Sequence, residues 1–158
     1  MTAKTIETYL QDHYAGSTAG TDAFRRVADG HGDPEVRSAV ERMAGEIEQD
    51  QEALEAIMAA FGVKADHLKN LPAKVGEKVA RLKLNERITK RSPLSDVLEL
   101  EVLSAAVHTK SLGWRLLMEV PDSRLDQTQL EDLHNRAENQ QEELERLRLK
   151  QAHKLAQA

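Results

Sequence analysis

Hydrophobic residues recur at every third or fourth position through most of the chain, which is the spacing of one face of an α-helix. Start and stop signals divide this pattern. Asp33 and Ser92 each precede a proline, as an N-cap residue does when proline occupies the first helical position. Gly62 follows an apolar run, where a glycine commonly ends a helix. The chain therefore has four predicted helices, at about residues 3–29, 34–61, 93–119 and 123–156.

Residues 62–92 separate the second and third helices and form a connection too long for a plain loop. Apolar residues at helical spacing within it, from Val75 to Leu82, predict a short helix at about 73–89. Short turns make the other neighbouring helices antiparallel, whereas a connection as long as the bundle makes the second and third helices parallel. These features predict an all-α fold, with residues 1–158 as a single ferritin-like four-helix bundle domain and a long helical crossover.

The predicted inward face of each helix is apolar at its ends and polar in its middle. Helix geometry places four of these polar side chains at one level of the bundle: His13, Asp50, His108 and His134. A second level, about one to two turns away, contains Glu46, Glu101 and Glu138. The predicted core-facing side of the third helix consists of Leu94, Val97, Leu98, Glu101, Ala105, His108, Leu112 and Leu116.

Imidazoles and carboxylates that converge from four helices are the ligand set of a metal site in a bundle core. Such a set suits iron, manganese or zinc as the cofactor. One alternative is a metal-free polar layer, in which Asp50 and Glu101 each orient a histidine by a hydrogen bond. Another is that some of these residues face solvent. The sequence leaves all three open.

The third helix has a second apolar face, formed by Leu100, Leu103, Val107 and Trp114. The crossover helix could cover this face, or the face could be the seam of a homodimer. We expect a homodimer, and both uses of the face are compatible with one another.

Composition excludes several classes of function. The chain has no cysteine, which rules out disulfide frameworks, thiolate metal sites and cysteine nucleophiles. A net charge of -5 gives no electrostatic reason to expect nucleic acid as a partner. We also expect no membrane partner and a cytoplasmic location, because no apolar run reaches the roughly 18 residues of a membrane span and the N-terminus lacks a signal-peptide core. No phosphate-binding glycine loop or nucleophile elbow supports an enzymatic activity.

Two segments resemble a known family. The pattern Tyr9-Leu10-Gln11-Asp12-His13-Tyr14-Ala15, together with a second helix that contains Glu46 and ends at Phe61-Gly62-Val63, is similar to the ferritin-like YciF-type bacterial stress proteins. That resemblance implies a ferritin-like bundle, often dimeric, that takes part in stress responses.

The ligand positions of that family are only partly matched. The glutamate of its first helix falls on Ser17, and the histidine of its second helix falls on Met43. The following glutamate falls on Glu46. We therefore expect a degenerate or altered core metal site, with a role in metal or oxidative-stress handling. The alternative is a non-catalytic bundle that binds a protein partner or itself.

Overall fold

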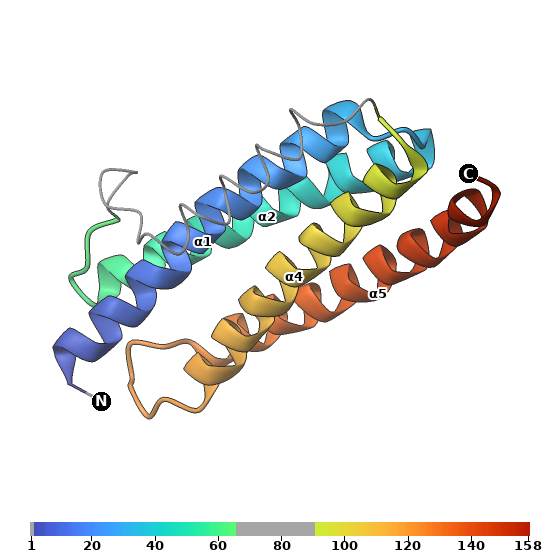
Figure 1. Ribbon diagram of the computed structural model, residues 1–158. Helices are drawn as coiled ribbons and strands as arrows, with labels where there is room; N and C mark the ends of the chain where they lie inside the picture. The colour runs from blue at the N-terminus through green and yellow to red at the C-terminus, as the bar shows by residue number, and fades with distance from the viewer. Residues whose placement is uncertain (1, 66–90) are drawn as a thin grey trace.

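In the computed structural model, residues 2–65 and 91–158 are described, and four helices run through them (Figure 1). These are α1 (Ala3–Gly30), α2 (Pro34–Ala60), α4 (Pro93–Met118) and α5 (Gln127–Gln157). The described part of the chain contains no strand, so the all-α prediction is confirmed. The helix predicted at 73–89 lies outside the described residues.

The capping residues start and end the helices much as the sequence predicts. Asp33 accepts a hydrogen bond from the backbone N–H of Glu35 at 2.9 Å, and Ser92 accepts one from Ser95 at 3.2 Å. Gly62 follows α2 with a φ of 71°, a left-handed conformation that glycine adopts without strain. The start of the fourth helix is a correction, because α5 is capped by Asp126 and begins at Gln127 and not at about residue 123.

The helices form two antiparallel hairpins, α1 with α2 and α4 with α5, and each hairpin is packed along its length (Figure 1). Helix α1 also packs against α4, and α2 and α5 form the least extensive of the four helix–helix contacts. Helices α2 and α4 run in the same direction, as the long connection between them predicts. None of the described helices is long and apolar enough to span a membrane.

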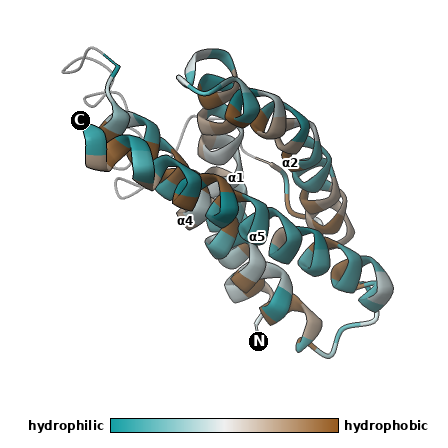
Figure 2. Cartoon of the chain, turned by 90° about the vertical axis from the view of Figure 1, so that its right-hand side faces the viewer, coloured by the Kyte–Doolittle hydropathy of each residue, from teal (hydrophilic) through white to brown (hydrophobic). Residues whose placement is uncertain are grey.

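The core contains apolar side chains from all four helices, including Leu10, Phe24, Met43, Leu103 and Leu144. The side of α5 that faces the viewer in Figure 2 is largely hydrophilic, as expected for a helix with one buried face. The bundle thus buries one stripe per helix and leaves the opposite side to water.

Helix α4 faces the core with the opposite side from the one predicted. Its buried residues include Leu100, Leu103, Val107, Trp114 and Leu117. The leucines of the predicted inward stripe are exposed instead: Leu94 (52%), Leu98 (43%), Leu112 (55%) and Leu116 (39%). Both sides of α4 are apolar, so periodicity alone could not choose between them. The observed choice keeps the charged and imidazole side chains of the other stripe in water, where they cost least.

Candidate functional site

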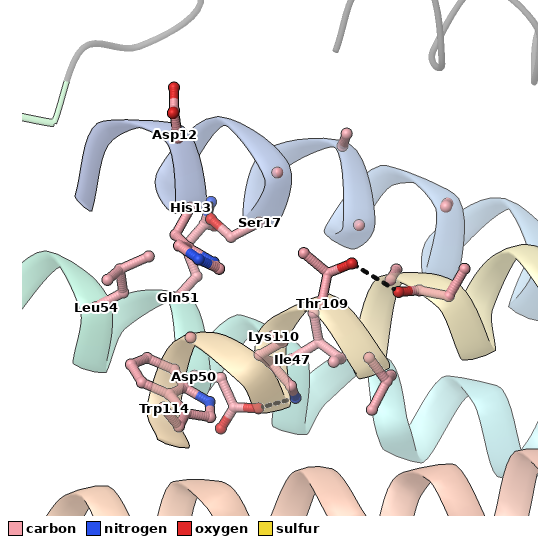
Figure 3. Close-up of a pocket in the computed structure, with 18 of the residues that line it drawn as sticks. Asp12, His13, Ser17, Ile47, Asp50, Gln51, Leu54, Thr109, Lys110 and Trp114 are labelled. Carbon is pink, nitrogen blue, oxygen red and sulfur yellow. Dashed lines mark hydrogen bonds and ion pairs between the residues drawn. The ribbon is translucent and has the colours of Figure 1, made fainter. Parts of the chain in front are cut away.

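A buried ion pair lies at the centre of the bundle. Asp50 of α2 is only 2% exposed, and its carboxylate forms a hydrogen bond and ion pair with the ammonium of Lys110 on α4 (Figure 3). Lys110 Nζ also donates to Oε1 of Gln140 on α5 at 2.6 Å. One lysine therefore joins three of the four helices.

Further polar side chains extend this pair towards the gap between α2 and α5. Gln140 Nε2 donates to Glu46 Oε2 at 2.8 Å, and the Arg136 guanidinium lies 3.4 Å from Asp50 Oδ1. Two cations therefore stand beside two carboxylates. We call Glu46, Asp50, Lys110, Arg136 and Gln140 the central network.

Burial acts on both partners of the central ion pair. Loss of hydration raises the pKa of the Asp50 carboxyl and lowers the pKa of the Lys110 ammonium, because it penalises each charged form. Attraction between the two groups opposes both shifts. Each charge is thus tolerated in the core because the other is present.

The seven residues predicted to ligate a metal are not gathered in one place. Asp50 and Glu46 both belong to the central network, whereas His108, Glu101 and Glu138 are exposed. His13 and His134 are half-buried on different helices. The two predicted levels are therefore not observed as such: Asp50 of one and Glu46 of the other are joined through Lys110 and Gln140, and none of the three histidines takes part.

The prediction is wrong about which side of α4 faces the core, but it places the residues of α4 at nearly the right height along the bundle. The sequence places Asp50 at the level of His108, and Asp50 contacts Lys110, two positions further along α4. Lys110 is not in the predicted inward stripe of the third helix. Its spacing of three from Val107 and four from Trp114 was the available signal, since all three share the observed core face.

A second cluster of possible ligand groups lies where the α1–α2 turn meets the start of α4. Within residues 2–65 and 91–158, His31, Asp96 and Glu99 are the one set of three such side chains whose ligand atoms lie within 4.8 Å of one another. The Arg91 guanidinium binds both carboxylates, with 2.6 Å to Asp96 Oδ1 and 3.0 Å to Glu99 Oε1. A cation is therefore already present between them.

His31 is also fully engaged. Its Nδ1 accepts the backbone N–H of Asp33 at 3.0 Å, which leaves the proton on Nε2, and Nε2 donates to the carbonyl of Asp96 at 3.0 Å. Neither ring nitrogen has a lone pair free for a metal. This cluster ties the two hairpins together at one end of the bundle.

A cavity of about 520 Å³ lies between α1 and α4 and reaches α2 (Figure 3). Its lining is mostly apolar, with His13, Ser17 and Gln51 among the polar exceptions. Gln51 Nε2 donates to Ser17 Oγ at 2.9 Å. Trp114 lines the cavity as well, and its buried Nε1 has no hydrogen-bond partner in the described part of the chain.

Comparison with protein-family models, with curated proteins and with solved structures finds no match to this chain. The resemblance to the YciF-type stress proteins stays a prediction.

Proposed function

We propose that this protein is a ferritin-like bundle in which an ion pair takes the place of a core metal, and that it acts as a non-catalytic, self-associating module. The observation that supports this most is Lys110. Its ammonium stands between Asp50 and Gln140, where ligands from different helices converge. A divalent cation placed there would be repelled by both Lys110 and the nearby Arg136.

The ferritin-like assignment is supported by the order and direction of the helices. Two antiparallel hairpins with parallel second and third helices are the arrangement that one long crossover produces. A cytoplasmic location, with neither nucleic acid nor membrane as a partner, is supported only by composition. A role in metal or oxidative-stress handling also stays a prediction, and it requires that Lys110 be displaced from the core.

The self-associating role is supported by the exposed side of α4. We call its seven residues the outer α4 row: Leu94, Leu98, Glu101, Ala105, His108, Leu112 and Leu116. Its four leucines are between 39% and 55% exposed. Exposed leucines gathered on one side of a helix, here with Glu101 and His108 between the two leucine pairs, are typical of an interaction surface.

The proposal is tested by measuring metal and mass on the same preparation. Protein purified without chelator is assayed for iron, manganese and zinc, titrated with each ion, and sized by light scattering. We expect no stoichiometric metal and a dimer. Stoichiometric binding that Asp50→Asn abolishes, and that the exposed control Asp132→Asn leaves intact, would overturn the metal-free core. A monomer at all concentrations would overturn self-association.

Binding of a small apolar molecule in the α1–α4 cavity is a second candidate function. Its volume and apolar lining suit a ligand of drug size, and the unpartnered Trp114 Nε1 could donate to a ligand hydroxyl. Dodecanol should therefore raise the melting temperature. Gly20→Leu should remove this shift, because a Cβ there lies 4.0 Å from the Ala106 Cβ across the cavity lining, so that the side chain enters the cavity. Gly45→Leu, outside the cavity lining, is the matched control.

A further inference from the structure

The outer α4 row has the spacing of a coiled-coil seam. Successive members are separated by four, three, four, three, four and four positions, and all seven side chains are exposed. Alternating steps of three and four keep one stripe facing a partner helix over its whole length. At a rise of about 1.5 Å per residue the row is about 33 Å long.

We propose that two copies of the chain associate through this row with their α4 helices antiparallel and Ala105 on the two-fold axis. This inference rests on the self-association proposed above and specifies its geometry. It also predicts that Glu101 of each copy lies beside His108 of the other.

The symmetry of the row identifies the partner as a second copy. Leu94 and Leu116 each lie eleven positions from Ala105, and Leu98 and Leu112 each lie seven positions from it. An antiparallel pair centred on Ala105 therefore places leucines opposite leucines at both ends. A two-fold interface requires such self-complementarity, whereas contact with a different protein does not.

Charge selects the antiparallel direction over the parallel one. Glu101 lies four positions before Ala105 and His108 lies three positions after it, so antiparallel helices bring the carboxylate next to an imidazole. Parallel helices in register would place Glu101 against Glu101, which is unfavourable for like charges. Arg148 of α5, at 3.4 Å from Glu101 Oε1, flanks this position within one copy. Ala105 is small and allows close approach at the axis.

Cross-linking tests the geometry, because the native chain contains no cysteine and each introduced thiol is unique. Under mild oxidation Ala105→Cys should form a disulfide-linked dimer, whereas Thr109→Cys, exposed on α4 but outside the row, should not. Leu98→Cys alone should stay unlinked, and a mixture of Leu98→Cys with Leu112→Cys should give a heterodimer.

A charge exchange tests the proposed Glu101–His108 contact. His108→Glu should weaken the dimer about tenfold in Kd, because it creates two carboxylate pairs across the axis. The exchange variant Glu101→His with His108→Glu should restore the wild-type Kd, which a merely structural role of either residue does not predict. Helix content from circular dichroism should be the same in all three proteins.

The possible failures are distinguishable. A dimer in which Leu98→Cys links to itself would overturn the antiparallel geometry and leave the proposed self-association in place. A monomer would overturn both the antiparallel geometry and the self-association.

Discussion

Asp50 and Lys110 show how a single side chain can change what a polar core is able to do. Without Lys110, Asp50 and Glu46 would be two carboxylates near the centre of a helical bundle, which is the start of a metal site. With Lys110 between Asp50 and Gln140, the same carboxylate charge is already compensated. The residue that fills the centre therefore decides between cation binding and an internal hydrogen-bond network.

Removing one partner of this pair should be costly. Lys110→Met leaves the 2% exposed Asp50 with Arg136 at 3.4 Å as its remaining cation. We expect a loss of about 3–5 kcal/mol in the free energy of unfolding, measured with urea, because a buried charge loses its partner. Lys150→Met is the control: that lysine pairs with Glu35 on the surface and should cost under about 1 kcal/mol.

The double variant Asp50→Leu with Lys110→Met completes this test. It removes both charges together and should recover part of the stability that Lys110→Met loses. A double variant as unstable as the sum of the two single variants would show that the pair is not energetically coupled.

Asp33 carries a second prediction, concerning pH. Hydrogen bonds from Lys154 and Gln151 of α5 and from the Glu35 backbone hold the pKa of its carboxyl well below the ordinary value. A depressed folded-state pKa stabilises the protein above the unfolded-state pKa of about 3.9, and this stability is lost as the pH falls below that value.

Asp33→Asn keeps a good N-cap but removes the charge, so it isolates this effect. We expect it to cost about 0.5–1 kcal/mol at pH 6, since Lys154 is half-exposed, and progressively less below pH 4. Urea unfolding from pH 2.5 to 7 measures the difference. A pH-independent cost would contradict the assignment, and Asp126→Asn at the α5 N-cap provides the comparison.

At the scale of elements, α1 and α4 come into contact at His13 and Gly113. A Cβ added to Gly113 would lie 2.8 Å from His13 Cε1 and 2.9 Å from Nδ1. Gly113 therefore leaves room for the imidazole, and the cost is the lower helix propensity of glycine, about 1 kcal/mol relative to alanine.

This contact predicts a strong coupling between the two positions. In a His13→Ala background, Gly113→Ala should stabilise the protein by about 1 kcal/mol, because only the propensity term remains. In the wild type the same substitution must displace the imidazole, and the gain should disappear or change sign. Thermal unfolding of the four proteins in the double-mutant cycle measures this coupling, and additive effects would show that the ring moves aside freely.

The positions of the helices along the chain are easier to predict from the sequence than the side of each helix that faces the core. Asp33-Pro34 and Ser92-Pro93 begin helices where predicted, because capping is a local interaction that adjacent residues specify. The side of α4 that faces the core was predicted wrongly. Leu98 and Leu103 are equally apolar, and the choice between them depends on contacts with the other helices, which periodicity does not contain.

The same holds for the candidate site: the sequence predicts the height of its residues along the bundle but not which of them face one another. Asp50 is recognisable as a buried charge because it interrupts an apolar stripe, and its level relative to α4 follows from helix rise alone. Its partner depends on the rotation of α4, which periodicity does not specify, and the sequence therefore favours His108 where the structure has Lys110. Gln140 differs by a similar small angle, because it lies two positions after Glu138, which the sequence predicts at the core.

At the scale of the molecule, polar contacts connect α2 and α5, which pack together least extensively of the four helix pairs in contact. Between α2 and α5, Arg42 pairs with Glu143, Glu35 pairs with Arg146, and Gln140 donates to Glu46. The hairpins are therefore joined on one side by the packing of α1 with α4 and on the other by charges. Six large apolar side chains stay exposed among the described residues, and four of them are the leucines of the outer α4 row.

This distribution predicts that stability depends on protein concentration. If a second copy covers the outer α4 row, dimerisation is linked to folding, and the melting temperature of the wild type should rise by a few degrees Celsius over a hundredfold increase in concentration. Leu98→Gln with Leu112→Gln should abolish this dependence. At low concentration the same variant should unfold within about 0.5 kcal/mol of the wild type, because both leucines are exposed within a single copy. A wild-type melting temperature that is constant from micromolar to millimolar concentration would mean that no second copy covers the row.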